Sequence, residues 1–286
     1  MEQTERGIAS TVDGNPFGAS PGCFARFDPR TDYARMARLG LRHVEVLAVG
    51  AAHFSSLAPE AMDDAAVEDL LSVLRAAGLA PMSASVATPL HDAAGLALLK
   101  RRLDFAHRLG VPVAQAGAGE APDAAARLTL LRHLAAAGDY AAERGLVLAL
   151  EIHPGLTVSG HAARALMAEL DHPHVRINYD TGNIVFYTDL DPAQDVEEIA
   201  PFVAHVHLKD KATRQQRTWD FVPIGQGIVN FPRIVEVLRT AGFRGPYSLE
   251  LELPGVADGS LPKETSEEGI RRSITYLQSI GLLPSQ

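Results

Sequence analysis

The sequence contains a single cysteine among 286 residues, and this scarcity excludes two ways of stabilising a fold. Cys23 has no second thiol in the chain with which to form an intramolecular disulfide. A lone thiolate also cannot build a cysteine-rich structural zinc site, which takes several sulfur ligands. The chain must therefore rely on a hydrophobic core, and its 47% apolar residues are ample for one.

Long apolar runs and clusters of positive charge are also missing. No stretch approaches the ~20 uninterrupted apolar residues of a membrane span, and residues 1–6 lack the basic start of a signal peptide. The 26 Lys and Arg residues are outnumbered by 35 Asp and Glu residues. Binding to nucleic acid phosphates requires clustered positive charge. We therefore expect a soluble cytoplasmic protein that binds neither nucleic acid nor a membrane.

What the sequence does have is a regular alternation of short apolar runs and longer amphipathic stretches. Residues 1–16 show no periodicity and predict a flexible N-terminal tail. After them, strands are predicted at 18–24, 43–49, 80–86, 111–116, 146–152, 175–179, 203–208 and 247–253. Amphipathic helices are predicted at 63–77, 93–109, 124–144, 161–170, 195–200, 231–241 and 267–280. Several of these helices are followed by glycine, which readily takes the left-handed conformation that ends a helix.

Strands that alternate with helices favour right-handed crossovers and a parallel sheet. Eight such units in roughly 250 residues match the size of a closed (β/α)8 TIM barrel. The alternative is an open doubly wound sheet, which usually carries a glycine-rich phosphate loop after its first strand. Residues 20–23 form no such loop, and no linker interrupts the later residues. We predict an α/β protein whose residues 17–286 form one barrel domain.

Four neighbouring strands end in an ionisable residue within or just after an apolar run. These residues are Glu151, Asp180, His207 and Glu250. Each alone could cap a helix or face solvent, but all four fall at the strand ends where barrel enzymes carry their active sites. Several buried carboxylates are costly unless a cation neutralises them. The oxygen-rich set predicts one shared divalent metal ion, with Mn²⁺ preferred and Mg²⁺, Co²⁺ or Zn²⁺ as alternatives.

Five segments of the second half resemble a known superfamily. They read LEIHPG (150–155), NYDTGN (178–183), HVHLKD (205–210), PIGQGIVNF (223–231) and YSLELE (247–252). Together they resemble the sugar phosphate isomerase/epimerase superfamily, which has the xylose isomerase-like TIM barrel. It includes tagatose and psicose 3-epimerases, inosose isomerases and dehydratases, and 3-dehydroshikimate dehydratases. The resemblance implies that Glu151, Asp180, His207 and Glu250 bind one metal ion, and that Glu151 and Glu250 also exchange protons with the substrate.

The endonuclease branch of this fold carries additional histidines at its third, fourth and sixth strand ends. Here the third and fourth predicted strands end in 83–86 (Ser-Ala-Ser-Val) and 114–117 (Ala-Gln-Ala-Gly). Three residues after Asp180, where that branch and the epimerases often have histidine, stands Asn183. An amide can bind a hydroxyl but cannot shuttle a proton. A DNA-repair function is therefore not expected.

Four residues are candidates for substrate binding. His153 shares the strand face of Glu151 and would contact a hydroxyl or simply lie at the rim, and Asn183 would bind a hydroxyl. Lys209 would either hold a substrate oxygen or form an ion pair with Asp210 at the rim. Arg217, in the loop after the seventh strand, suits a carboxylate or phosphate unless it is merely solvated.

Three further positions complete the predicted site. His205 has the same strand parity as His207 and is predicted to be a buried structural histidine. Glu252 shares the face of Glu250, but the resemblance places the ligand at Glu250. His53 and Phe54, after the second strand, are predicted to help roof the pocket.

These residues predict an enzyme that acts on a small polyol or keto-sugar substrate. The leading hypothesis is an isomerase or epimerase of a keto sugar, sugar phosphate or keto-inositol that works through a metal-stabilised enediolate. The alternative is a dehydratase of the inosose or 3-dehydroshikimate type, because both reactions begin with the same proton abstraction. A third hypothesis is a non-catalytic metabolite-binding barrel. Because barrels of this type often dimerise, a homodimer is considered as the assembly.

Overall fold

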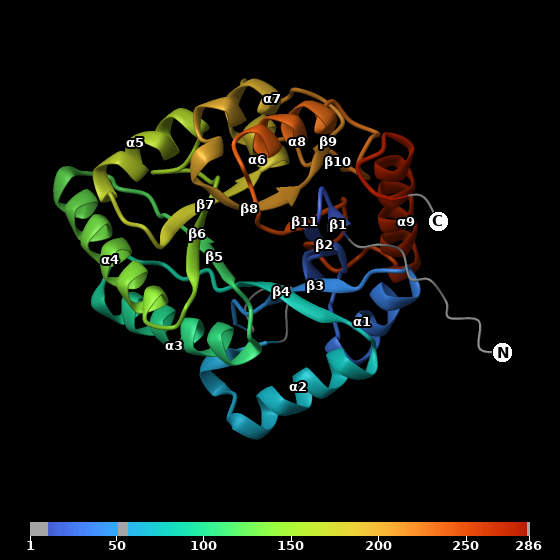
Figure 1. Cartoon of the computed structure of the whole chain (residues 1–286), viewed down its shortest axis with the longest axis horizontal. Coiled ribbons are helices and arrows are strands. Elements are labelled where there is room, and N and C mark those ends of the chain that lie inside the picture. Colours follow the sequence, from blue (N-terminus) through green and yellow to red (C-terminus); the bar gives the residue numbers. More distant parts are fainter. Residues whose placement is uncertain (1–10, 51–56, 285–286) are drawn as a thin grey trace.

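Eight parallel strands close into a barrel in the computed structural model, which describes residues 11–50 and 57–284 (Figure 1). In their order around the barrel they are β2 (Asn15–Ala19), β3 (His43–Leu47), β4 (Ala80–Ser85), β5 (Val113–Gly117), β6 (Val147–Glu151), β7 (Val175–Asp180), β8 (Val203–Leu208) and β11 (Tyr247–Leu249). The barrel closes where β11 pairs with β2, and β2 also pairs with β3. The predicted single (β/α)8 barrel is confirmed.

Helices surround this barrel (Figure 1). They are α1 (Pro29–Arg38), α2 (Asp64–Ala76), α3 (Ala93–Leu109), α4 (Ala124–Ala142), α5 (Gly160–Leu170), α6 (Thr181–Tyr187), α7 (Pro192–Asp195), α8 (Phe231–Thr240) and α9 (Lys263–Ser279). Asp63, Asp92 and Asp123 cap α2, α3 and α4 by accepting a backbone N–H of the first turn. Among the helices of the described residues, none is long and apolar enough to cross a membrane.

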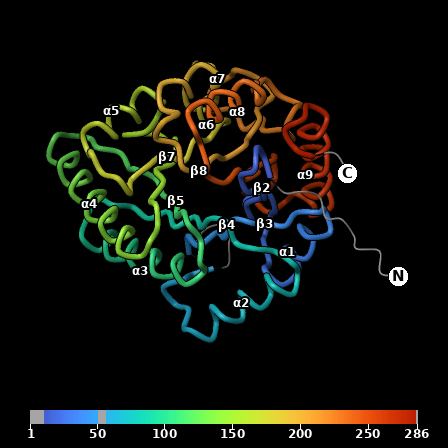
Figure 2. Tube along the Cα trace, viewed as in Figure 1, coloured from blue at the N-terminus to red at the C-terminus, as the bar shows by residue number. Residues whose placement is uncertain are grey.

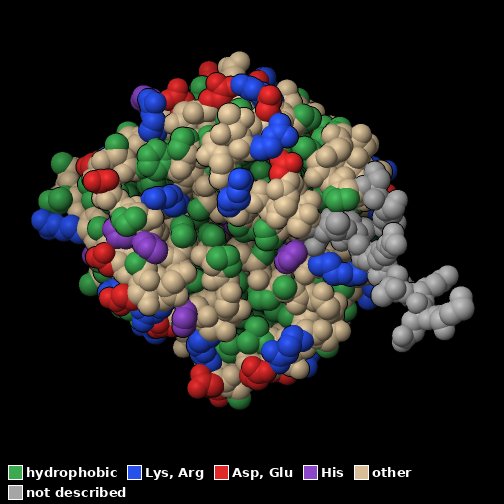
Figure 3. All heavy atoms as spheres, viewed as in Figure 1, with side chains coloured by type: hydrophobic (Ala, Val, Ile, Leu, Met, Phe, Trp, Pro, Cys, Tyr) green, Lys and Arg blue, Asp and Glu red, His purple; other side chains and the backbone are tan. Residues whose placement is uncertain are grey.

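The first and last helices lie side by side and complete the ring (Figure 2). Two ion pairs join them: Arg35 Nη1 of α1 lies 2.8 Å from Glu267 Oε1 of α9, and Lys263 Nζ of α9 lies 2.5 Å from Asp32 Oδ2 of α1. On the face drawn in Figure 3, Lys and Arg side chains are scattered among acidic and apolar ones and do not form one stripe.

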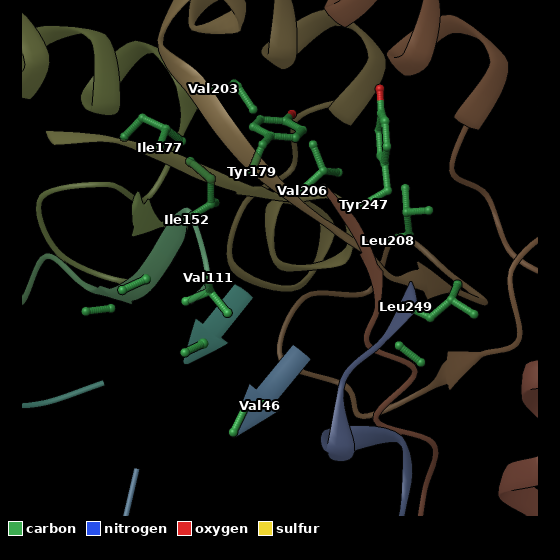
Figure 4. Packing of buried hydrophobic residues seen from close by; sticks show 14 of the residues in the cluster. Val46, Val111, Ile152, Ile177, Tyr179, Val203, Val206, Leu208, Tyr247 and Leu249 are labelled. Carbon is green, nitrogen blue, oxygen red and sulfur yellow. The ribbon is translucent and has the colours of Figure 1, made fainter. Parts of the chain in front are cut away.

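Successive side chains of each barrel strand point alternately toward the helices and into the barrel. Apolar side chains such as Ile177, Tyr179 and Val206 lie on the side of the strands that faces the helices, where they form the main core (Figure 4). The opposite parity points into the barrel, and there several buried residues are polar: Glu45, Ser83, Gln115, Asn178, His205 and His207. The interior of this barrel is therefore a polar layer beneath the carboxyl ends of the strands.

The N-terminal prediction needs correction. Residues 11–16 are not a tail: β1 (Thr11–Val12) pairs antiparallel with β2 through a turn in which Asp13 and Gly14 both have positive φ. The first barrel strand accordingly begins at Asn15 and ends at Ala19, instead of spanning 18–24. Pro16 made this segment look like a loop, but proline is tolerated near the start of a strand. Residues 1–10 lie outside the described part of the chain.

Other boundaries also differ from the predicted ones. The predicted strand 247–253 ends at Leu249, and Glu252 has a positive φ of 42°. The predicted helix 195–200 is a pair of short 3₁₀ turns after α7. The loop after β8 contains a small antiparallel pair, β9 (Asp210–Lys211) and β10 (Phe221–Val222). These two-residue strands and the short helix α6 have too little periodicity to be predicted from sequence.

Candidate active site

The barrel brings together the four residues that the sequence placed at strand ends. Glu151 ends β6, Asp180 ends β7, His207 lies in β8 and Glu250 follows β11, and these strands are consecutive neighbours. One ligand atom from each lies within 4.8 Å of the others. We call these four residues the metal group, because a shared metal ion is the role predicted for them.

His207 lies at the centre of the metal group. Its Nδ1 is 3.0 Å from Glu151 Oε1, 3.3 Å from Glu250 Oε2 and 3.8 Å from Asp180 Oδ2. Three carboxylates and one imidazole form a hard, oxygen-rich donor set of the kind that Mn²⁺ and Mg²⁺ prefer. The donor chemistry of these residues therefore fits a divalent cation.

Asp180 is held in place within the metal group. Its Oδ1 accepts the backbone N–H groups of Gly182 and Asn183, both at 2.9 Å, so the start of α6 fixes the carboxylate. Its Oδ2 is buried and has no hydrogen-bond partner among the described residues, but the Lys209 ammonium lies 3.0 Å from it. A buried carboxylate oxygen is costly unless a cation faces it, and Lys209 supplies that charge here.

The pKa values in and around the metal group reflect several carboxylates that lie close together. Although burial opposes ionisation, the charges of His207 and Lys209 lower the pKa of Glu250 to about 2. Burial raises the pKa of Asp180 to about 6. Burial also disfavours a charged His207, but Glu250 and Glu45 hold the pKa of His207 well above its usual range. The carboxylates thus attract positive charge strongly to this point of the barrel.

Lys209 lies beside the metal group and not at the rim. Its side chain is 2% exposed, and Nζ lies 3.0 Å from Asp180 Oδ2, 2.7 Å from Glu250 Oε2 and 2.8 Å from Glu252 Oε2. The hypothesis of a rim pair with Asp210 is wrong, because consecutive residues of an extended chain point to opposite sides. Asp210 instead accepts the backbone N–H groups of Gly225 and Gly227 at 2.9 Å.

A cavity of about 140 Å³ reaches the metal group at Glu151 and Glu250. It is lined by Glu151, His153, Asn183, Phe186, Tyr187, Lys209, Trp219, Phe221, Glu250 and Glu252. Phe186 and Phe221 stack with their ring centroids 5.6 Å apart. Trp219 Nε1 donates to the Glu252 carbonyl at 2.9 Å, which ties the loop after β8 to the segment after β11. One wall of the cavity is therefore aromatic and the other carries carboxylates.

Three of the four predicted substrate-binding residues line the cavity. Asn183 lines the cavity and donates from Nδ2 to the Ile152 carbonyl at 2.9 Å. His153 also lines it, with Nε2 3.2 Å from Tyr187 Oη. Lys209 lies at its floor, as described above. Arg217 is not among the described residues that line the cavity, and its guanidinium lies 5.9 Å from the Tyr187 ring centre.

Size alone does not identify the site. A larger hollow of about 510 Å³ lies between α8 and residues 280–282 and includes none of the metal group. His53 and Phe54, predicted to roof the pocket, lie outside the described residues. The site is therefore assigned from its chemistry.

Sequence reasoning missed Glu45. This fully buried residue of β3 lies with Oε2 3.0 Å from His207 Nε2, on the side of the ring opposite the other carboxylates. The available signal was a lone glutamate in the alternating strand His-Val-Glu-Val-Leu (43–47). Nothing in the local sequence shows that it meets a histidine 162 residues later.

His205 occupies the interior position predicted for it, one layer below His207. It is fully buried, with Nδ1 2.8 Å from Asn178 Oδ1 and Nε2 3.0 Å from Ser83 Oγ. Burial lowers the pKa of His205 to about 3. His205 is therefore a neutral part of the polar interior at ordinary pH.

Comparison with known proteins identifies the family. The model of the xylose isomerase-like TIM barrel family matches residues 33–280. L-ribulose-5-phosphate 3-epimerase UlaE of Shigella boydii is 28% identical over 165 residues, which cover 56% of each chain. Inosose dehydratase of Geobacillus thermodenitrificans is 29% identical over 137 residues, covering 42% of this chain and 46% of that one. The matched segments thus span about half the length of these curated relatives.

A solved structure shows the same fold. The xylose isomerase-like TIM barrel protein of Mycobacterium smegmatis, in complex with magnesium, superposes with a TM-score of 0.70 at 21% identity, covering 92% of this chain and 99% of that one. The match over residues 33–280 and the closed barrel agree with the motifs of the second half. The chain therefore belongs to the xylose isomerase-like TIM barrel family, within the sugar phosphate isomerase/epimerase superfamily.

Proposed function

We propose that this protein is a divalent-metal-dependent isomerase or epimerase of a small polyhydroxy ketone, such as a ketose or a keto-inositol. The observation that carries the proposal is the convergence of three carboxylates and one histidine, of which Glu151 and Glu250 line a cavity of about 140 Å³. The epimerase among the curated relatives supports this reaction class.

The metal ion would be held by Glu151, Asp180, His207 and Glu250. Mn²⁺ is the preferred ion, with Mg²⁺, Co²⁺ and Zn²⁺ as alternatives, and the magnesium complex of the M. smegmatis protein supports a cation of this type. When bound, the ion would supply a positive charge for a substrate oxygen that becomes negative during the reaction.

Proton transfer is assigned to Glu151 and Glu250. Both line the cavity, and their side chains are 19% and 14% exposed. One carboxylate would take the proton from the carbon next to the carbonyl, so that the C–H electron pair forms the enediolate. The other would return a proton to the opposite face of that carbon, which inverts its configuration. In each residue the oxygen that moves the proton must be the one not bound to the metal.

The cavity chemistry favours an uncharged substrate. Glu151, Glu250 and Glu252 line it, and Lys209 is already paired with Glu250 and Glu252. A phosphate deep in this cavity would meet three carboxylates, whereas the aromatic wall suits the C–H faces of a sugar. His153 and Asn183 would bind its hydroxyls. Arg217 would contact only a part of the substrate that extends beyond the cavity.

A dehydratase is the second candidate, and Lys209 is the observation that favours it. Its ammonium lies at the cavity floor, where it could protonate a departing hydroxyl, and Asn183 stands where a proton-shuttling histidine is often found. The inosose dehydratase among the relatives supports this class. The complete metal group argues against the third hypothesis, a barrel that only binds metabolites.

The metal requirement is tested first, by metal analysis and by thermal unfolding before and after EDTA. A ligand present at 100 times its Kd stabilises the folded state by about 2.7 kcal/mol. We therefore expect the melting temperature to fall by several degrees on chelation and to recover with Mn²⁺. An unchanged melting temperature in both steps would contradict the metal site.

The reaction is then tested by incubation with ketoses, inososes and 3-dehydroshikimate in D₂O, with Mn²⁺ present. An epimerase yields a product of unchanged mass except for one deuterium at the reacting carbon. A dehydratase yields a product lighter by one water that absorbs in the ultraviolet. Comparing a ketose with its phosphate ester tests the predicted preference for an uncharged substrate. Metal binding without exchange in any of these compounds would reject both enzyme classes for them.

A further inference from the structure

The polar interior of the barrel contacts the metal group at the ring of His207. We propose that Glu45 is a positioning residue that holds this ring with Nδ1 turned toward the metal group. This inference rests on the proposed function, because it concerns how the barrel prepares one of the four ligands. Glu45 itself does not touch the cavity.

The two ring nitrogens of His207 face different partners. Nδ1 faces Glu151 and Glu250, at 3.0 and 3.3 Å, whereas Nε2 faces Glu45 Oε2 at 3.0 Å. A carboxylate at hydrogen-bond distance fixes the position of the ring nitrogen that it faces. Glu45 therefore holds the edge of the ring that points away from the metal group, and Nδ1 is the nitrogen left turned toward it.

Two buried amides also hold the ring of His207. Asn178 Nδ2 lies 3.2 Å from His207 Nδ1, and Gln115 Nε2 lies 3.1 Å from His207 Nε2. The two amides are linked to each other, because Asn178 Nδ2 lies 3.5 Å from Gln115 Oε1. Of these three interior partners of the ring, Glu45 alone carries a charge, so it is the strongest constraint on the ring position.

A purely structural role explains Glu45 poorly. The residue is fully buried, and its Oε1 has no hydrogen-bond partner among the described residues. An ionised carboxylate with an unsatisfied oxygen is expensive in a protein interior. Its neighbours Val44 and Val46 show that apolar residues fill this strand easily. A carboxylate that is costly to the fold but faces a predicted ligand is characteristic of residues that orient metal-binding histidines.

The test compares wild type with Glu45→Gln by calorimetric titration with Mn²⁺ and by thermal unfolding of the metal-free proteins. The glutamine has the same size but carries no charge, so the ring of His207 loses its charged partner at Nε2. We expect Mn²⁺ affinity to fall about 10- to 100-fold. The metal-free variant is expected to melt below wild type, because His207 loses a buried ion-pair partner, so the Mn²⁺ affinity and not the melting temperature decides the test.

Two further variants sharpen the comparison. Ser83→Ala removes a hydroxyl that lies 3.3 Å from the same Glu45 oxygen but leaves the contact with His207 intact, so its Mn²⁺ affinity should match that of wild type. Glu45→Asp keeps the charge but withdraws it from Nε2, so its affinity should be intermediate. If Glu45→Gln does not fold, Glu45→Asp carries the same test.

The outcomes separate this inference from the proposed function. Wild type that binds no Mn²⁺ would overturn the metal site and the inference with it. Wild type that binds Mn²⁺ while Glu45→Gln binds it equally well would overturn the inference alone. A lower melting temperature of metal-free Glu45→Gln with unchanged affinity would assign Glu45 a structural role.

Discussion

Within the metal group, two residues are accessible and two are not. The side chains of Glu151 and Glu250 are 19% and 14% exposed, whereas those of Asp180 and His207 are at most 1% exposed. Only groups that reach the cavity can exchange a proton with a bound molecule. In the proposed function, this difference in burial assigns Asp180 and His207 to binding the ion alone, and Glu151 and Glu250 to binding the ion and reaching the substrate as well.

Replacing either accessible glutamate should stop turnover. A glutamine cannot accept a proton from carbon, so we expect Glu151→Gln and Glu250→Gln to lower kcat by about 10²- to 10⁴-fold or more. Deuterium exchange at saturating Mn²⁺, together with a metal titration, distinguishes lost chemistry from lost metal. Glu120→Gln, an exposed carboxylate on the loop after β5, is the matched control. Full activity of Glu151→Gln with metal bound would exclude its proton-transfer role.

Removing the Lys209 ammonium should make the fold depend more strongly on metal. Its pairs with Asp180, Glu250 and Glu252 would be lost, and breaking a buried pair costs about 3–5 kcal/mol. We expect Lys209→Met to melt well below wild type in EDTA and to gain more than wild type from added Mn²⁺. Lys100→Met, on α3, is the control. Equal responses of wild type and Lys209→Met to EDTA would contradict this electrostatic balance.

At the scale of elements, Asp210 connects the end of β8 to the segment before α8. It is fully buried and accepts backbone N–H groups from Gly225, Gly227 and Val229. The backbone at Gly227 packs closely against the Asp210 carboxylate, because a Cβ at this position would lie 2.2 Å from Asp210 Oδ1. Asp210 also belongs to β9, the partner of β10, which carries Phe221 of the aromatic wall.

Asp210→Ala should therefore weaken both the fold and substrate binding. It leaves four backbone donors unsatisfied, those of Lys211, Gly225, Gly227 and Val229, each at a cost of about 1–3 kcal/mol if it stays buried. We expect a lower melting temperature and a larger rise in KM than fall in kcat, because the aromatic wall is loosened while the metal group stays in place. Asp258→Ala, at an exposed turn, is the control. A loss confined to kcat would show that Asp210 acts on the chemistry.

The elements also show what the sequence could and could not predict. The eight strands could be predicted from their apolar runs. The four residues of the metal group could be predicted because each interrupts or ends such a run, and parallel strands bring these ends together. The role of Glu45 could not be predicted, because its partner His207 lies across the barrel and far along the chain. The N-terminal hairpin and the β9–β10 pair were missed because strands of two residues have no period to detect. The metal-binding and catalytic roles themselves stay predictions.

At the scale of the whole molecule, His205 should couple folding to pH. Its pKa is about 3 in the folded protein, because of burial, and about 6.5 when exposed. Between these values the unfolded chain binds a proton that the folded chain does not. The free energy of unfolding should therefore decrease as pH falls through this window, by up to about 1.4 kcal/mol per pH unit.

Urea unfolding at pH 4 to 7, with EDTA present, measures this effect. His205→Gln cannot take up the proton, so its stability should fall less steeply with decreasing pH than that of wild type, whatever its stability at pH 7. His161→Gln, on the exposed side of α5, controls for the loss of a histidine elsewhere. Parallel curves for wild type and His205→Gln would exclude this linkage.

The lone cysteine, Cys23, is buried where the barrel closes, so its reactivity can report on the opening of the barrel. Cys23 Sγ lies 3.3 Å from the Leu249 carbonyl, near the seam where β11 closes the barrel on β2. The side chain is fully buried, and burial raises the pKa of the thiol to about 12. A thiol reagent can therefore label the folded chain only when this seam opens, and no other thiol in the sequence contributes signal. Since Glu250 follows Leu249 directly, the rate of Cys23 labelling with and without Mn²⁺ measures how much the proposed metal ion would slow the opening of this seam.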